Sequence, residues 1–238
     1  MNSLTSVTPC GILRAMRFVL VHSPVVGPST WRWVADALRS NGHETIVLDL
    51  VVAAVTGDPG VFAQAAVQAA DSDEETVIVG HSGAGVVLPL VAAGLTSKPR
   101  RVIFVDAGVP PCEGTASVGG DFLATLRDLA TNGVLPVWSQ WWAEGVLESL
   151  VQDDLRRSEI EKELPQVPLA FYEATIEVPT DWCESAGAYV LLSDAYRGDA
   201  GRAASLGWPV VERLGAHLDI VNDEEAIADI LLSLVEGS

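Results

Sequence analysis

The stretch from residue 76 to residue 85, TVIVGHSGAG, constrains the fold of this chain more than any other. A β-branched run, Thr76–Val79, ends abruptly at a turn that carries Ser82, and a long apolar run follows. This order predicts a buried strand, a sharp turn and a buried helix. Small residues stand two positions before and two positions after the serine, at Gly80 and Ala84, where larger side chains would collide with the strand and the helix. The turn therefore presents Ser82 as a candidate nucleophile.

Strand-like and helix-like segments alternate along most of the chain. Near-continuous apolar runs are typical of strands buried on both faces of a parallel sheet. Such runs predict strands at residues 17–22, 44–50, 76–79, 101–106, 188–193 and 208–212. The predicted fold class is α/β, with about six mostly parallel strands flanked by helices. At 238 residues the chain can form one such domain, over residues 17–238, with a sizeable core.

The alternation stops at Pro110-Pro111, and the next segment reads as helical up to about residue 178. Helices inserted between two strands of an α/β sheet predict a lid, here over residues 112–178. The lid contains Trp138, Trp141 and Trp142. We expect these tryptophans to line an apolar substrate pocket, and the alternative is that they only pack the lid onto the domain.

Charge and cysteine content exclude several classes of partner. The 32 acidic residues outnumber the 14 basic ones and give a net charge of −18, which disfavours binding to nucleic acid and to anionic membranes. No apolar run reaches the ~18–20 residues of a membrane span. The three cysteines, Cys10, Cys112 and Cys183, have no metal-ligand spacing, and their odd number predicts reduced thiols in a cytoplasmic protein without a metal. Residues 1–16 make a poor signal peptide and are predicted to be an N-terminal extension.

A serine hydroxyl is a weak nucleophile, so it needs a base to take its proton and an acid to orient that base. The chain has four histidines, and only His217 follows the predicted strand at residues 188–193. It lies in the loop between the last predicted strand and the last predicted helix. We therefore predict that His217 is the base.

These motifs together resemble those of the α/β-hydrolase superfamily, and most of all the group that contains plant methylesterases and hydroxynitrile lyases. The resemblance covers about 220 residues from Arg17 onward, and Ala84 departs from it because the strict serine motif ends in glycine. It implies a cofactor-free enzyme that acts on esters, thioesters or related acyl compounds. The matching pieces are Val19–His22, Gly27, Trp31, Gly42-His43, Val79–Gly83 and Gly215–Leu218.

Two aspartates compete for the role of the acid. Asp194 follows the strand after the predicted lid, and Asp106 ends the strand before it. Both would lie at the carboxyl edge of the sheet, where ligands bind in open α/β folds. We predict Asp194, because the loop after the penultimate strand is the commoner place for the acid in this superfamily.

The loop after the first strand departs from the family pattern. It reads His22-Ser23-Pro24-Val25, and an ungapped match puts Pro24 where a backbone N–H should help to bind the oxyanion. Proline has no N–H. Gly83 can still donate, and either Val25 N–H or the Ser23 hydroxyl could replace the lost donor, unless the loop is shifted by one residue and the hole is complete. We expect His22, Ser23 and Pro24 to border the substrate.

The sequence thus predicts a serine hydrolase in which Ser82, His217 and Asp194 act on a small, apolar acyl compound. One alternative is lyase or cyclase chemistry of secondary metabolism on the same scaffold, which the loss of a donor at Pro24 favours. A second alternative is a ligand-binding protein that retains the three residues but turns over poorly. The sequence leaves open whether the chain forms a homodimer.

Overall fold

The computed structural model describes residues 15–184 and 187–236. The predicted N-terminal extension therefore lies outside the described residues, apart from Ala15 and Met16. Met16 is hydrogen-bonded to the domain: its carbonyl oxygen accepts from Glu44 N at 2.9 Å.

Six parallel strands form the central sheet, in the order β2-β1-β3-β4-β7-β8. This confirms the predicted α/β class with a parallel sheet. The chain starts at β1, adds β2 at the near edge and then builds the sheet toward the other edge. Because the strands are parallel, the carboxyl ends of β1, β3, β4 and β7 lie along one border. The strands are β1 (Arg17–Val21), β2 (Glu44–Val47), β3 (Thr76–His81), β4 (Arg101–Val105), β7 (Gly187–Leu191) and β8 (Val210–Glu212).

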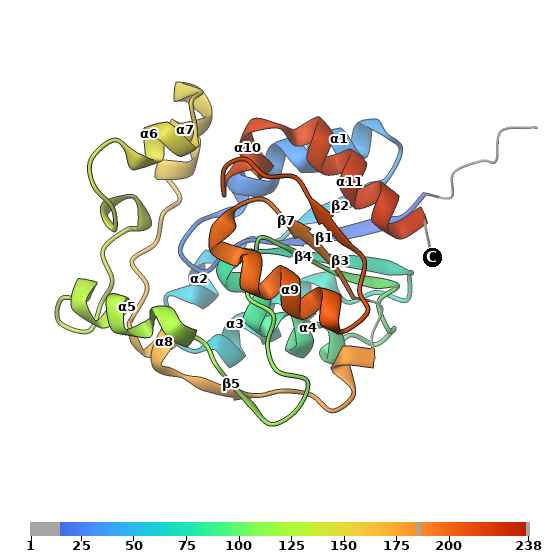
Figure 1. Ribbon diagram of the computed structural model, residues 1–238, viewed down its shortest axis with the longest axis horizontal. Coiled ribbons are helices and arrows are strands. Elements are labelled where there is room, and N and C mark those ends of the chain that lie inside the picture. The colour runs from blue at the N-terminus through green and yellow to red at the C-terminus, as the bar shows by residue number, and fades with distance from the viewer. Residues whose placement is uncertain (1–14, 185–186, 237–238) are drawn as a thin grey trace, which may run out of the picture.

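Helices cover both faces of this sheet (Figure 1). On one face α1 packs beside α11, and on the other face α3 packs beside α4. No helix in the described ranges is both long and apolar enough to cross a membrane. The helices outside the insertion described below are η1 (Pro28–Trp31), α1 (Arg32–Ser40), α2 (Val51–Ala54), α3 (Pro59–Ala70), η2 (Ser82–Val87), α4 (Leu88–Gly94), η6 (Asp194–Tyr196), α9 (Arg197–Ser205), α10 (Asp219–Asn222) and α11 (Glu224–Glu236).

The core follows from the apolar runs of the sequence. Every residue of β1, β3, β4 and β7 is buried, as expected for strands with helices on both faces. Trp31 is fully buried beneath the first loop, and its indole N–H donates to Val21 O at 3.0 Å. The central strands are therefore held rigidly, and so are the loops that leave their carboxyl ends.

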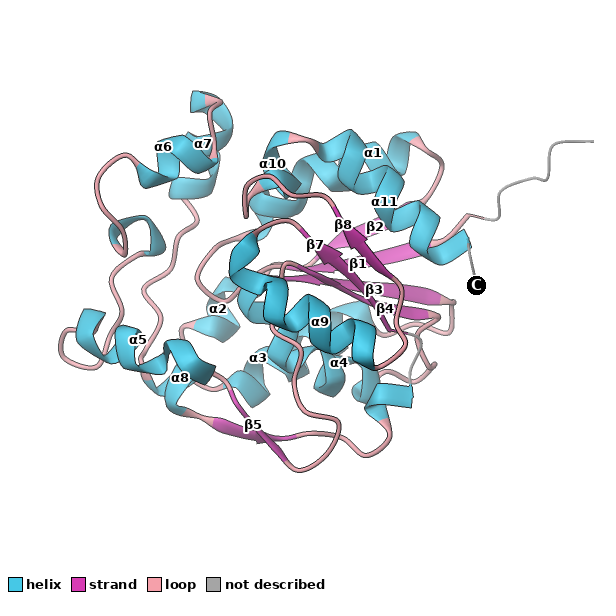
Figure 2. Ribbon diagram, viewed as in Figure 1, coloured by secondary structure: helices cyan, strands magenta, loops and turns pink. Residues whose placement is uncertain are grey.

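The segment between β4 and β7 is called the insertion. Most of its helices lie to the left of the sheet, and its short strands lie below it (Figures 1 and 2). It contains short helices, as the sequence predicts, together with a two-stranded antiparallel sheet that the sequence pattern does not predict. Strands of three residues are too short to show an alternating pattern. Its elements are β5 (Thr115–Ser117), η3 (Gly120–Phe122), α5 (Leu123–Leu129), η4 (Trp138–Gln140), α6 (Val146–Leu150), α7 (Asp154–Glu161), α8 (Ala170–Glu173), β6 (Thr175–Glu177) and η5 (Trp182–Glu184).

Cys112 and Cys183 form a disulfide, so the prediction of reduced thiols is wrong for this pair. The two residues are 71 positions apart in sequence and lie at the two ends of the insertion. Sequence spacing could not reveal this pair because the fold, and not a local motif, brings the two ends together. The third cysteine, Cys10, lies outside the described residues.

Candidate active site

Ser82 lies in a strained turn between β3 and η2, as the sequence predicts. Its φ of +55° is in the left-handed region, which residues other than glycine seldom adopt. The turn needs small residues: a Cβ on Gly80 would lie 2.7 Å from the Leu88 side chain, and a Cβ on Gly85 would lie 2.3 Å from Gly108 O. Ala84 is fully buried, so its methyl group is accommodated where the strict motif has glycine.

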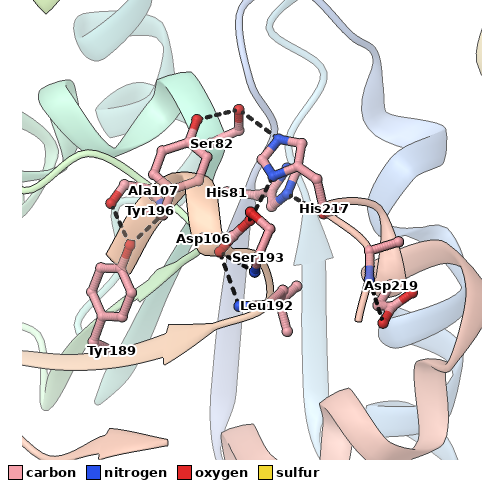
Figure 3. Close-up of polar contacts among 11 residues, drawn as sticks. His81, Ser82, Asp106, Ala107, Tyr189, Leu192, Ser193, Tyr196, His217 and Asp219 are labelled. Carbon is pink, nitrogen blue, oxygen red and sulfur yellow. Dashed lines mark hydrogen bonds and ion pairs between the residues drawn. The ribbon is translucent and has the colours of Figure 1, made fainter. Parts of the chain in front are cut away.

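A chain of hydrogen bonds runs from Ser82 through His217 to Asp106 (Figure 3). Ser82 Oγ lies 3.0 Å from His217 Nε2, and His217 Nδ1 lies 2.7 Å from Asp106 Oδ2. A carboxylate only accepts hydrogen bonds, so Nδ1 carries the proton and Nε2 of the neutral ring is left as an acceptor. The geometry suits transfer of the serine proton to the histidine.

Asp106 is fully buried at the end of β4 and has a φ of +43°. Its Oδ1 accepts from Leu192 N and Ser193 N, each at 2.9 Å, and its Oδ2 accepts from Ser193 Oγ at 2.5 Å. Burial alone would raise the pKa of this carboxyl group, but the hydrogen bonds from His217 and Ser193 outweigh burial and lower the pKa. Asp106 is therefore held as a charged carboxylate behind the histidine.

The structure corrects the predicted position of the carboxylate that contacts His217. Asp194 begins η6, its side chain is 80% exposed, and it pairs with Arg197 at 2.7 Å. Asp106, the alternative at the end of β4, occupies the position beside His217. The physical reason is the direction of the chain, since Asp194 turns into a helix that points its side chain to solvent.

The loop that carries His217 is braced from below. Asp219 Oδ2 accepts from Ala216 N at 3.0 Å and from Arg213 Nη1 at 2.8 Å. A Cβ on Gly215 would lie 2.1 Å from Asp219 Oδ2, so a larger residue there would displace this carboxylate. Asp219 thus holds the loop that carries His217 and does not contact the His217 ring.

The imidazole of His217 lies between two other rings (Figure 3). The Tyr196 ring stacks on it at 5.3 Å and 9°, and the His81 ring lies at 4.4 Å on a plane tilted by 33°. His81 Nε2 donates to His217 O at 3.0 Å. Burial, together with the nearby His217, lowers the pKa of His81 to about 3, so His81 stays neutral.

The loop from His22 to Val25 faces the turn of Ser82. A Cβ on Gly83 would lie 3.0 Å from Ser23 Oγ and 3.3 Å from Pro24 Cδ. The proline ring therefore lies against Gly83, and it has no N–H to offer there. The oxyanion roles of Gly83 and Val25 stay predictions.

The ring of His22 is held by the backbone of neighbouring loops, and its place beside the substrate stays a prediction. Its ring is fully buried, Nδ1 donates to Ser23 O at 2.8 Å, and Nε2 accepts from Leu50 N at 3.0 Å. Both ring nitrogens are used by the backbone, and burial lowers the pKa of the ring, which keeps it neutral. His22 fixes the loop that carries Ser23 and Pro24.

The three tryptophans lie in the insertion. Trp138 is buried, Trp141 donates its indole N–H to Pro136 O at 2.8 Å, and Trp142 stacks on Phe122 at 6.1 Å and remains 44% exposed. The contacts of Trp141 and Trp142 are with other residues of the insertion. Their role in binding substrate stays a prediction.

Two residues of the site have no signal in the sequence. Ser193 donates to Asp106, and the Tyr196 hydroxyl lies 3.2 Å from Ser82 Oγ. Both follow β7, in the same short stretch as Asp194. Over the ranges that the structure covers, no cluster of three or more His, Cys, Asp or Glu could hold a metal ion.

Curated proteins with a similar sequence are plant esterases. The chain is 32% identical over 129 residues to the esterase PIR7B of Oryza sativa subsp. japonica. The matched stretch covers 50% of this chain and 47% of the relative. It is 26% identical over 129 residues to methylesterase 8 of Arabidopsis thaliana, covering 48% of this chain and 47% of the relative. The chain thus spans about half the length of the curated relatives it matches. No family model matches the chain.

Solved structures extend the likeness over nearly the whole chain. Tomato methylketone synthase I in complex with 2-tridecanone superposes with a TM-score of 0.74 at 15% identity, covering 94% of this chain and 98% of that one. Similarity at this level of identity shows the fold. Together with the curated relatives it confirms the resemblance that the sequence predicts: the chain has the α/β-hydrolase fold and is similar to the methylesterase-type group of that superfamily.

Proposed function

We propose that the chain is a serine hydrolase that cleaves an ester, thioester or related acyl compound. Ser82 is the nucleophile, His217 is the base and Asp106 orients the base. The unbroken hydrogen-bond chain that starts on a serine in a strained turn carries this proposal. The curated relatives, whose names are esterase and methylesterase, support the same class of reaction.

In the first half of the reaction Ser82 Oγ attacks the carbonyl carbon, and its proton passes to His217 Nε2 across the 3.0 Å hydrogen bond. The carbonyl oxygen takes up the electron pair as an oxyanion. When the intermediate collapses, the bond to the leaving group breaks, and His217 returns the proton to the departing oxygen or sulfur atom. Ser82 is then acylated.

In the second half a water molecule gives a proton to His217 Nε2 and attacks the acyl carbon. Collapse releases the carboxylic acid and returns the proton to Ser82 Oγ. The buried Asp106 keeps His217 in one tautomer throughout, because Nδ1–H stays donated to Oδ2 at 2.7 Å. The neutral His81 on one face of His217 adds no positive charge that would oppose the imidazolium.

Aromatic side chains near Ser82 support an apolar substrate. Phe62 meets Phe171 with ring centroids 5.7 Å apart, and Phe171 meets Tyr172 at 5.3 Å. The Tyr172 hydroxyl lies 3.8 Å from where a Cβ on Gly83 would be, so this aromatic row ends beside the nucleophile. All three side chains are buried, and Phe171 and Tyr172 come from the insertion.

One observation favours the alternative of lyase or cyclase chemistry. Pro24 has no N–H, and its ring lies against Gly83, where hydrolysis of an ester benefits from a second donor. A reaction that uses His217 only to move protons would need that donor less. The loop after β1 is thus the feature that separates the two enzymatic functions.

A fluorophosphonate probe, which phosphonylates activated serines, tests the proposal. We expect labelling of the wild type and none of Ser82→Ala. Turnover of para-nitrophenyl butyrate should fall by about 10⁶-fold in Ser82→Ala. Ser233→Ala is a matched control, because Ser233 is an exposed serine whose hydroxyl donates to Ile230 O at 2.7 Å. If the wild type is not labelled, or if Ser82→Ala is labelled as fast as the wild type, Ser82 is not the nucleophile.

A further inference from the structure

Tyr196 lies closer to the nucleophile than its place in the sequence suggests. It is the last residue of η6, the short helix that follows β7 and begins at Asp194. Its hydroxyl oxygen lies 3.2 Å from Ser82 Oγ, and its ring stacks on His217 with an angle of 9° between planes (Figure 3). Tyr196 therefore contacts both residues that exchange a proton in the proposed reaction.

The direction of the hydrogen bond between Tyr196 and Ser82 follows from their neighbours. His217 gives its Nδ1 proton to Asp106, so its Nε2 accepts the single hydroxyl proton of Ser82. Ser82 Oγ then has only lone pairs to offer, and the Tyr196 hydroxyl must be the donor. Burial raises the pKa of Tyr196 to about 12, so the hydroxyl keeps its proton at any ordinary working pH.

The loop after β1 lacks a donor that the fold usually supplies. Pro24 carries a ring carbon where an N–H would be, and that carbon lies 3.3 Å from the Cβ position of Gly83. The oxygen that becomes the oxyanion is two bonds away from Ser82 Oγ, so a donor that contacts Oγ can turn to this oxygen when both lie on the same side of Oγ. The Tyr196 hydroxyl is such a donor.

We propose that Tyr196 is a catalytic residue whose hydroxyl supplies a hydrogen bond to the oxyanion beside that of Gly83 N–H. This inference rests on the proposed function of Ser82. As Oγ bonds to the carbonyl carbon and its proton moves to His217 Nε2, the Tyr196 hydroxyl turns from Oγ to the carbonyl oxygen that gains the electron pair. Tyr196 keeps its own proton, and when the leaving group departs with the proton from His217, its hydroxyl returns to Oγ.

The test is the rate at which a fluorophosphonate labels Ser82, because this reaction needs no knowledge of the natural substrate. Ser82 Oγ bonds to phosphorus, fluoride leaves, and the phosphoryl oxygen takes the place of the oxyanion. Tyr196→Phe keeps the ring that stacks on His217 and removes only the hydroxyl. We expect its labelling rate to fall by about 10²–10³-fold, as on removal of one oxyanion donor. The thermal midpoint should change little.

A second readout separates donation from packing. Replacing Tyr196 with difluorotyrosine keeps its size and makes the phenol more acidic, so labelling should decline at a lower pH than in the wild type. The same replacement at Tyr189, whose hydroxyl donates to Ala107 O at 2.8 Å, controls for fluorination of a buried tyrosine. We expect that control to leave the pH profile of labelling where it is.

Three outcomes overturn parts of the account separately. If the wild type labels at Ser82 and Tyr196→Phe labels at the same rate, Tyr196 is not a donor and the proposed function stands. If Tyr196→Phe labels slowly but the difluorotyrosine protein keeps the wild-type pH profile, the residue acts through packing and the inference fails. If the wild type is not labelled, the proposed function fails and the role of Tyr196 fails with it.

Discussion

An aspartate follows each of the strands β4 and β7, but one carboxylate is buried and the other is exposed to solvent. Asp106 leaves β4 with its side chain fully buried, and its two oxygens accept four hydrogen bonds, one of them from His217. Asp194 follows β7 with its side chain 80% exposed and pairs with Arg197, whose side chain is 50% exposed. The two strands are neighbours in the sheet, so position at the carboxyl edge does not by itself select the functional carboxylate.

Backbone conformation makes the difference. Asp106 adopts a φ of +43°, and its carboxylate meets two N–H groups at the start of the loop after β7. After β7 the chain winds into η6, and Arg197 follows Asp194 at a spacing of three residues, where helical side chains meet. The β7 loop therefore supplies donors to the carboxylate of β4, whereas its own carboxylate faces solvent.

The largest difference between the two loops should appear in kcat when each aspartate is substituted in turn. Asp106→Asn keeps the size of the side chain but removes the charge that fixes the tautomer of His217, so kcat should fall by about 10⁴-fold. Asp194→Asn breaks only an exposed ion pair, which is worth about 0–1 kcal/mol, and should leave kcat unchanged. Steady-state turnover of para-nitrophenyl butyrate measures both. A larger loss in Asp194→Asn than in Asp106→Asn would reverse the assignment.

The disulfide should have the next largest effect. Cys112 lies on the segment that leaves β4 and Cys183 on the segment that enters β7, with a separation of 71 residues. Closing a loop of this length stabilises the folded chain by about 4 kcal/mol through the entropy of the unfolded state. Urea unfolding should show a loss of that order in the double variant Cys112→Ser, Cys183→Ser.

Reduction of the wild type should reproduce the double variant, and the single variant Cys183→Ser should match both. We expect kcat to change little, because neither cysteine belongs to the hydrogen-bond chain of Asp106. Equal stability of oxidised and reduced protein would show that the bond contributes nothing. A large fall in kcat would mean that it sets the geometry of the two strand ends.

Ser193 lies in the loop after β7 and donates to Asp106 at the end of β4. Its substitution should have the smallest effect of the three, and that effect is on the free energy of unfolding. Ser193→Ala removes the hydroxyl that donates to Asp106 Oδ2 at 2.5 Å, and a hydrogen bond to a charged group is worth about 1.5–3 kcal/mol. The pKa of Asp106 is lowered from its ordinary value of 3.8, so this stabilisation is complete above that pH and is lost as pH falls through the pKa of the folded state. The gap in unfolding free energy between wild type and variant should therefore narrow under acid.

Urea unfolding between neutral and strongly acidic pH measures that gap. Ser205→Ala serves as the matched control. The Ser205 hydroxyl is exposed and donates at 2.6 Å to the backbone carbonyl oxygen of Arg202, which carries no net charge. Its effect should be small and independent of pH. A gap for Ser193→Ala that stays constant down to the lowest pH would show that Ser193 does not act through the charge of Asp106.

The sequence predicts the fold well because the fold rests on local patterns. Apolar runs mark the buried strands, and the small residues around Ser82 mark the turn, which the structure shows to be enforced at Gly80 and Gly85. Placing His217 after the last strand needs only the order of elements. Each of these features can be read within a few residues of the chain.

The remaining features depend on contacts between distant parts of the chain. Asp106 is distinguished from Asp194 by a backbone angle and by donors from residues 192 and 193, neither of which leaves a local pattern. The disulfide joins two residues that are 71 positions apart. Tyr196 reaches Ser82 from 114 positions away, and a lone tyrosine after a strand carries no signature of that contact.

The central claim is that Asp106, and not Asp194, holds the proton-bearing Nδ1 of His217. Proton NMR of protein with ¹⁵N-labelled histidine tests it most directly, since a ring N–H donated to a buried carboxylate resonates far downfield. The account predicts this signal in the wild type and in Asp194→Asn, and its loss in Asp106→Asn. A signal that survives in Asp106→Asn and disappears in Asp194→Asn would contradict it.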